Sequence, residues 1–265
     1  MMRFPIATLI RFCHNHGLLQ VANRPQWYTV HGGSREYVRR IVAMVGDARL
    51  HAPVRAVIPL ADGQGGVMVH TDAGAERFDE VVLATHADTS LKILGAAASA
   101  EQREVLSAVR YHDNVAVLHT DTSVLPQRKA WAAWNYERAA LAQAEDRAVC
   151  LHYLINRLQP LPWTQPVIVS LNPLHDPKPE SVLARFDYAH PVFDQAAMDA
   201  QHRLPALQGQ HGVWLAGAWT GYGFHEDGLK SGLAVAAGLL AKDGVTLADD
   251  AQALAARYLQ EARLP

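Results

Sequence analysis

The chain has little charge imbalance and little cysteine, and each shortage excludes a class of function. Its 265 residues include 24 Lys and Arg against 26 Asp and Glu, for a formal net charge of −2 at pH 7. So small a charge creates no overall field that attracts nucleic acid, and we expect no nucleic-acid partner. The two cysteines, Cys13 and Cys150, form no CxxC pair. Without a secretory signal we expect them to be reduced thiols in a cytoplasmic protein.

Long apolar runs are absent as well. No stretch approaches the ~18 to 20 residues that a helix needs to cross a bilayer, so we expect no integral membrane segment. Arg11 interrupts the apolar opening of the chain, which we interpret as a helix of the fold. Because that helix is amphipathic, peripheral contact with lipid stays open as the alternative to packing on the core.

Several motifs of catalytic and metal sites are also missing. His14-x-His16 and His225-Glu226-Asp227 contain metal-ligand residue types, but neither has HExxH spacing or belongs to a Cys/His set of four. We therefore expect no metal site. Without a GxSxG nucleophile elbow or a GxxxxGK[ST] loop, the sequence also disfavours hydrolase chemistry and nucleotide hydrolysis.

The most informative segment present is Gly212 to Gly238, GVWLAGAWTGYGFHEDGLKSGLAVAAG. A short apolar strand, 213–216, leads through a glycine-punctuated loop to a helix expected to open at Asp227-Gly228. Glycines let the backbone approach a ligand, and a helix start offers unpaired N–H groups at the positive end of its dipole. We expect an electron-rich ligand edge there; the alternative is that these glycines serve only packing. Asp227, just before the expected helix, suits an N-cap role.

The rest of the chain predicts a mixed α/β fold. With 49% hydrophobic residues, it is long enough for one large or two medium domains. A β-meander is expected at 52–60, 66–71 and 76–78, followed by a buried parallel strand at 81–84 that ends near Thr85. A helix at 96–109 then leads to strands expected at 115–119, 130–135, 148–155 and 166–171. The chain returns through a helix at 195–204, so the first domain is expected to be discontinuous.

The Gly212 to Gly238 segment resembles the C-terminal cofactor motif of the flavin-containing amine oxidase and phytoene desaturase superfamily. Three further stretches, HGGSREYVRRI (31–41), NRLQPLPW and RFDYAHPVFD, resemble a narrower bacterial group described as predicted NAD/FAD-binding oxidoreductases. The family's N-terminal GxGxxG unit is absent, and Ala218 stands where the family usually has a carboxylate. We interpret the chain as the C-terminal part of a larger flavoprotein.

The resemblance implies FAD as the cofactor, bound by an incomplete Rossmann-like domain that includes the meander. This FAD-binding domain is expected to comprise residues 1–95 and 205–265, with an antiparallel-sheet substrate domain at 96–204. The implied cofactor-binding residues are Gly32, Gly33, Ser34, Val54, Thr85, Gly217, Ala218, Asp227, Gly228 and Leu229. Tyr222 and His225 are the implied catalytic residues, nearest the flavin face, although His225 can equally serve only to order the loop.

The resemblance further implies an FAD-dependent oxidoreductase that passes a hydride or electrons from substrate to flavin. Many aromatic residues and few charges in the middle of the chain favour a largely apolar small molecule, an amine or an unsaturated lipid. A second hypothesis is a truncated, non-catalytic relic, or a subunit whose FAD site another polypeptide completes. An in-frame GxGxxG segment encoded just upstream would favour the enzyme, and its absence would favour the second hypothesis.

Overall fold

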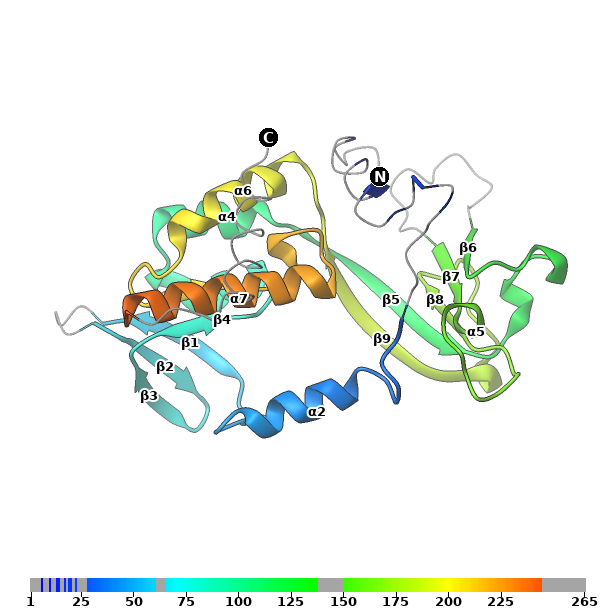
Figure 1. Ribbon diagram of the computed structural model, residues 1–265, viewed down its shortest axis with the longest axis horizontal. Coiled ribbons are helices and arrows are strands. Elements are labelled where there is room, and N and C mark those ends of the chain that lie inside the picture. The colour runs from blue at the N-terminus through cyan, green and yellow to red at the C-terminus, as the bar shows by residue number, and fades with distance from the viewer. Residues whose placement is uncertain are drawn as a thin grey trace. The chain divides into compact units, whose positions relative to one another are not determined.

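The computed structural model describes residues 28–60, 65–137 and 150–244, together with positions 6, 10, 13, 14, 17, 19, 20 and 22. The amphipathic opening helix, for which lipid contact is the alternative to packing on the core, lies largely outside these described residues. The chain divides into two compact units, the first formed by Met1–Arg110 with Pro191–Pro265 and the second by Tyr111–His190 (Figure 1).

The first unit contains the predicted meander. Strands β1 (Val54–Pro59), β2 (Val67–Thr71) and β3 (Gly74–Phe78) pair in that order, antiparallel throughout. Val57 and Val67 are fully buried, while every residue of β3 is exposed. The meander therefore has one edge packed into the unit and one edge in solvent.

A two-stranded parallel sheet forms the centre of the first unit. It consists of β4 (Val81–Leu83) and β10 (Val213–Leu215), with Val81 opposite Val213 and Leu83 opposite Leu215. All of β10 is buried, as expected for an apolar run without alternation. Because the strands are parallel, their carboxyl ends lie at the same edge.

Trp214 of β10 is held by its surroundings on several sides. Its ring occupies the space that a Cβ would need at Gly209 and at Gly238, where the nearest ring atoms would lie 2.8 and 2.5 Å away. Its Nε1–H donates to the Glu80 carboxylate at 2.7 Å, and Lys242 lies over the ring and pairs with Glu80. These contacts fix α7 against β10.

The helices of the first unit whose bounds lie within the described ranges are α2 (Arg35–Met44), α3 (Ala87–Leu94), α4 (Ala100–Ala108), α6 (Gln195–Leu207) and α7 (His225–Lys242). Short 3₁₀ turns lie at η1 (Gly95–Ala97) and η6 (Ala218–Thr220). A capping box between Ser99 and Gln102 starts α4, and the Asp194 carboxylate accepts from the Ala197 N–H to start α6.

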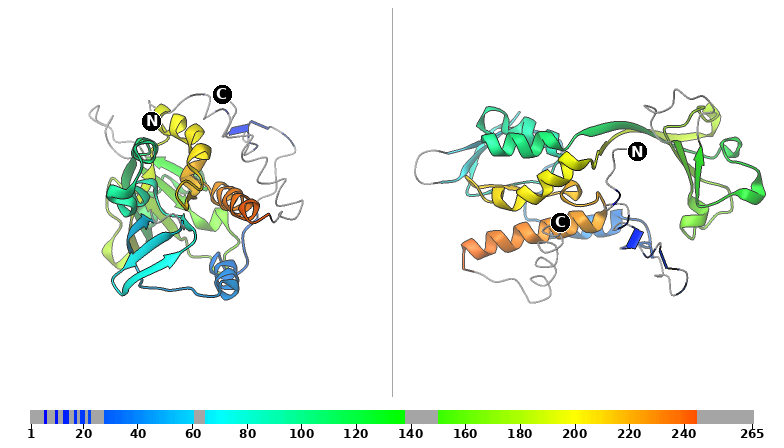
Figure 2. Two further views of the ribbon diagram at one scale, coloured as in Figure 1. Left: turned by 90° about the vertical axis from the view of Figure 1, so that its left-hand side faces the viewer. Right: turned by 90° about the horizontal axis from the view of Figure 1, so that it is seen from above.

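Helices α4 and α6 pack side by side in the first unit (Figure 2). Val105 and Leu106 of α4 and Leu204 and Leu207 of α6 are buried, and Arg203 pairs with Glu104 at 2.8 Å. The second unit therefore begins at Tyr111 and is shorter than the 96–204 segment expected to bind substrate. Its assignment to substrate binding stays a prediction.

The second unit is built on a five-stranded sheet of order β6-β7-β8-β5-β9. Its strands are β5 (Tyr111–His119), β6 (Trp134–Glu137), β7 (Cys150–Leu154), β8 (Ile168–Leu171) and β9 (Val182–Pro191). Shorter elements are η2 (Thr122–Val124), η3 (Arg128–Ala130), α5 (Ile155–Leu158) and η5 (Pro179–Ser181). Leu125, Leu154 and Ile168 form a buried cluster. The pairs β5–β8, β6–β7 and β7–β8 are antiparallel, as predicted.

Some predicted boundaries were wrong. The strand expected at 130–135 begins only at Trp134, because the Asn135 side chain bonds both the N–H and the carbonyl of Ala132 and so forms a turn there. Helix α3 and strand β9 had no predicted counterpart.

No helix among the described residues has both the length and the apolar character required for a bilayer span.

Candidate functional site

Most of the residues predicted to bind a cofactor lie at the end of β4, in the loop that follows β10, and in the first turns of α7. Gly217 and Ala218 follow β10, and Thr85 follows β4, so the parallel pairing places both segments at one sheet edge. The Nε1–H of Trp219 donates to the Thr85 carbonyl at 3.0 Å and links the two segments directly. This edge is therefore a preformed corner of the first unit.

Gly217 is required by the shape of this corner. Its φ is +143°, and a Cβ would lie 2.8 Å from Cδ1 of Trp219. The Gly217 N–H donates to Ser231 Oγ at 3.0 Å, and Ser231 in turn donates to the Gly228 carbonyl at 2.8 Å. Ser231 thus ties the end of β10 to the first turns of α7.

A buried glutamine of α6 holds the next part of the loop. The side-chain amide of Gln201 donates to the Trp219 carbonyl at 2.8 Å and to the Gly221 carbonyl at 2.7 Å. Without the Gln201 amide, both carbonyls would lose this hydrogen-bond donor in a largely buried setting, which would cost free energy. Sequence reasoning missed Gln201, because a single glutamine on a helix carries no local signal of what it contacts.

The N-cap prediction for Asp227 was wrong. Helix α7 begins at His225, two residues earlier than expected, so Asp227 is its third residue. Its carboxylate accepts from the Phe224 N–H at 2.9 Å and so bonds back toward the preceding loop. Burial raises the pKa of Asp227, and hydrogen bonds from the backbone at Phe224 and Tyr222 oppose that rise.

Packing explains why residue 221 is a glycine, but it does not explain the glycine at 228. At Gly221 a Cβ would lie 2.6 Å from an Asp227 carboxylate oxygen, so the close approach of this side chain requires glycine. At Gly228, within α7, a Cβ would meet only Ala218 atoms at 3.8 and 3.9 Å, which is ordinary contact. Packing of the described residues therefore does not require a glycine at 228, although glycine costs a helix interior roughly 1 kcal/mol relative to alanine.

The remaining predicted residues of the loop differ in exposure. Tyr222 is half-buried, whereas His225, the first residue of α7, is exposed. Leu229 is 55% exposed. Thus a tyrosine, a histidine and a leucine side chain lie at or next to the start of α7.

The other predicted cofactor residues lie in separate segments. Gly32 and Gly33 have φ of +82° and +88°, and Ser34 precedes α2, in which no residue is buried. Val54 begins β1 and is 37% exposed. A place for these residues beside a cofactor stays a prediction.

Comparison with solved structures gives the fold. The chain matches the CLA-producing fatty acid isomerase of P. acnes at 14% identity, with a TM-score of 0.55, over 80% of this chain and 52% of that one. It matches cyclohexylamine oxidase of Brevibacterium oxydans at 13% identity, with a TM-score of 0.55, over 80% of this chain and 53% of that one. It also matches putrescine oxidase bound to putrescine at 14% identity, with a TM-score of 0.54, over 79% and 53%.

The chain thus spans about half the length of the solved structures it matches. No protein-family model matches it, and no curated protein does. The structural match extends over both units, since four fifths of the chain is covered. The chain therefore has the fold shared by amine oxidases such as putrescine oxidase and cyclohexylamine oxidase, as the resemblance in its sequence predicts.

Proposed function

We propose that the corner formed by β4, β10 and the start of α7 holds the flavin ring of FAD in an oxidoreductase of the amine oxidase type. The observation that carries this proposal is Gly228. The described residues leave room for a side chain there, and the atoms nearest to that space belong to Ala218 of the loop that follows β10. A ligand that approaches the backbone of Gly228 would account for that glycine.

The electrostatics of the corner fit a flavin. Helix α7 is 18 residues long, so the positive end of its dipole lies at its first turn, next to Gly228. When bound, the flavin would accept a hydride or electrons from the substrate. Its reduction would place negative charge on the ring. Gly217, Ala218, Gly228 and Leu229 would hold the ring, and Thr85 would face it from the end of β4.

Tyr222 and His225 are the residues proposed to contact substrate. His225 is exposed and its imidazole can accept or donate a proton, while Tyr222 offers a half-buried hydroxyl. The substrate we propose is a largely apolar amine or unsaturated lipid, bound with the help of the middle segment 96–204. Val54 and the Gly32 to Ser34 segment are proposed to contact the remainder of FAD.

A matched pair of glycine substitutions on α7 tests the flavin site. Gly228→Val should weaken FAD binding about tenfold, because the side chain would intrude where the backbone meets the ring. Gly232→Val lies one turn further along, where a Cβ has no neighbour within 4 Å. It carries the same change in helix propensity and should leave affinity unchanged. Titration with FAD of the protein extended upstream in frame, followed by quenching of flavin fluorescence, measures both variants.

Equal FAD affinities for the two variants would show that the flavin ring does not bind at this corner.

The reaction class needs a separate measurement. Anaerobic mixing of the flavin-loaded protein with a panel of apolar amines and unsaturated lipids should bleach the flavin absorbance with a member of one class. A flavin that stays oxidised with every compound would argue against the proposed substrates while leaving the binding site intact.

A specific observation favours the second candidate function, a subunit completed by another polypeptide. Helix α2 buries none of its residues, and Ile41, Val42 and Met44 are 55%, 47% and 85% exposed. An uncovered apolar helix face is what a missing packing partner would leave. Co-purification of a GxGxxG-containing polypeptide that raises FAD affinity would support this alternative.

A further inference from the structure

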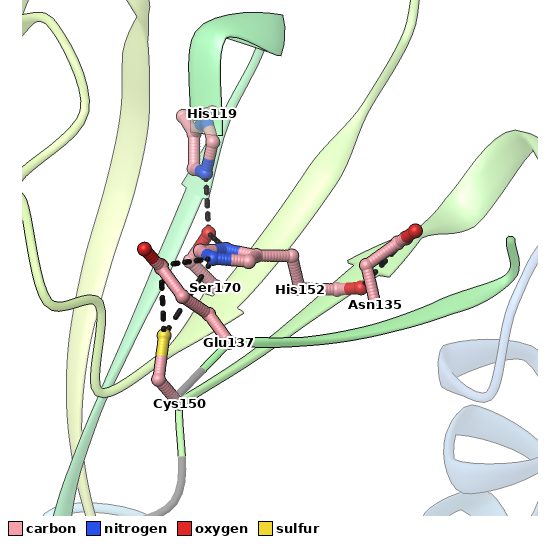
Figure 3. Close-up of polar contacts among 6 residues, drawn as sticks. All are labelled: His119, Asn135, Glu137, Cys150, His152 and Ser170. Carbon is pink, nitrogen blue, oxygen red and sulfur yellow. Dashed lines mark hydrogen bonds and ion pairs between the residues drawn. The ribbon is translucent and has the colours of Figure 1, made fainter. Parts of the chain in front are cut away.

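Three side chains of metal-ligand type meet on one face of the β6–β7 pair in the second unit (Figure 3). Glu137 lies directly opposite Cys150 in the strand register. His152 is two residues after Cys150, so both point to the same face of β7. The pairing of β6 with β7 therefore brings Glu137 next to Cys150, which lies 13 positions later in the sequence, and next to His152, which lies two positions after Cys150.

The spacing of the three ligand atoms is close to that of the edges of a tetrahedron around a metal ion. Cys150 Sγ lies 3.6 Å from Glu137 Oε2 and 3.5 Å from His152 Nε2, and the latter two atoms are 3.1 Å apart. Zinc binds sulfur at about 2.3 Å and nitrogen or oxygen at about 2.0 to 2.2 Å, which gives tetrahedral edges of about 3.3 to 3.6 Å. Little rearrangement would be needed for all three atoms to contact one ion.

The burial of the cluster suits a bound ion with one open position. Cys150 and His152 are 2% and 1% exposed, whereas the Glu137 side chain is 37% exposed. Water can thus reach the cluster from the carboxylate side and fill the fourth position.

The second nitrogen of His152 is held by a chain of hydrogen bonds. Ser170 Oγ lies 2.6 Å from Nδ1 of His152 and 2.7 Å from Nε2 of His119, and the Asp121 N–H donates to Nδ1 of His119. His119 must therefore carry its ring proton on Nε2 and donate to Ser170. Ser170 has a second lone pair, which can accept from Nδ1 of His152. In that tautomer, the lone pair of His152 Nε2 points into the space beside Glu137 and Cys150, where a metal ion can accept it.

We propose that Glu137, Cys150 and His152 bind a divalent transition-metal ion of the zinc type, with water as the fourth ligand. On binding, the Cys150 thiol loses its proton to solvent and a metal–sulfur bond forms. His152 keeps one proton, which resides on Nδ1 and is donated to Ser170. The mixture of sulfur, nitrogen and oxygen ligands favours zinc, or cobalt in its place, over magnesium or calcium.

Cobalt substitution of the whole chain tests the site, because a cobalt–thiolate bond gives a charge-transfer band and tetrahedral cobalt gives strong visible bands. Wild-type protein dialysed against cobalt should show both, and zinc should displace them. Cys150→Ser should abolish the charge-transfer band, whereas Cys13→Ser, which removes the other cysteine, should leave it unchanged. Glu137→Gln should weaken cobalt binding at least several-fold.

The proposal would be overturned by folded wild-type protein that takes up no stoichiometric cobalt or zinc, or by a band that disappears with Cys13→Ser. In that case the cluster is a hydrogen-bonded network only. Circular dichroism establishes the fold of each variant. Should Cys150→Ser not fold, the wild-type spectrum and Glu137→Gln decide: an unchanged cobalt affinity in Glu137→Gln would count against the site.

Discussion

Asp227 orders the loop before its own helix by accepting from backbone N–H groups that precede it. Asp227→Asn keeps an acceptor oxygen, whereas Asp227→Ala removes it and should lower the free energy of unfolding by about 1 kcal/mol. Burial raises the folded pKa above the ordinary value of 3.8. The wild type therefore loses stability as pH rises from 3.8 through the raised value, and Asn avoids that loss.

Thermal unfolding at neutral pH distinguishes the two variants. The Asn variant should melt at or above the wild-type temperature, and the Ala variant below it. Three equal melting temperatures would show that this carboxylate contributes nothing to the loop.

Asp121 has the opposite titration behaviour. Burial by itself would raise its pKa, but hydrogen bonds from Lys178 and Ser123 and the charge of Lys178 lower it to about 2. A carboxyl with a depressed folded pKa stabilises the fold above its ordinary value of 3.8, and the effect is lost as pH falls from there toward about 2. Asp121→Asn should cost about 1 kcal/mol at neutral pH, since the amide can satisfy only one of the two N–H donors.

Urea unfolding of wild type and Asp121→Asn over a series of pH values measures this effect. The difference in unfolding free energy should narrow as pH falls below 3.8. A difference that stays constant would mean that the ionised carboxylate has no special role.

At the scale of elements, α6 positions the cofactor loop through Gln201. Gln201→Leu should lower the free energy of unfolding by about 1 to 3 kcal/mol, because two loop carbonyls lose their donor. It should also speed amide exchange around 219–221. Gln195→Leu is the matched control, because Gln195 is exposed on the same helix and its side chain donates to Asp199 rather than to the loop. Equal exchange in both variants would exclude this role.

The elements that sequence reasoning predicted well are those with a strong local pattern. The meander has alternation and turn residues, and the parallel pair β4–β10 consists of short continuous apolar runs. Helix α3 is short, with eight residues, and β9 mixes apolar and charged residues without regular burial. Their patterns are too weak to be recognised without the tertiary packing that stabilises them.

The candidate sites were predicted unevenly for a related reason. Gly217 and Ala218 lie in one contiguous loop, so a local motif was sufficient to find them. Glu137 and His152 meet only through strand pairing, and no residue spacing along the chain indicates that pairing. The start of α7 was misplaced because Asp and Gly are typical of a helix start, whereas here His225 and Glu226 already lie in the helix.

For the whole molecule, we expect residues 1–265 expressed alone to retain little FAD. A dinucleotide cofactor is normally also held by a pyrophosphate-binding turn at a first helix, and the sequence has no GxGxxG for it. Strands β4 and β10 pair only with each other among the described residues, and α2 exposes apolar side chains. Such edges and faces favour aggregation.

Expression beside a form extended upstream in frame, with flavin absorbance and size-exclusion chromatography, measures this prediction. The extended form should be yellow and monodisperse, and the shorter form colourless or aggregated. A yellow, monodisperse shorter form with near-stoichiometric FAD would mean that its cofactor site is complete.

The packing of Trp214 has a consequence for how this protein can vary. Because its ring fills the space of a Cβ at both Gly209 and Gly238, the three positions share one volume. A side chain at 238 requires a smaller residue at 214, while a smaller residue at 214 alone leaves a cavity. Substitutions at these sites should therefore be accepted in pairs, and a related chain with alanine at 238 should lack the tryptophan.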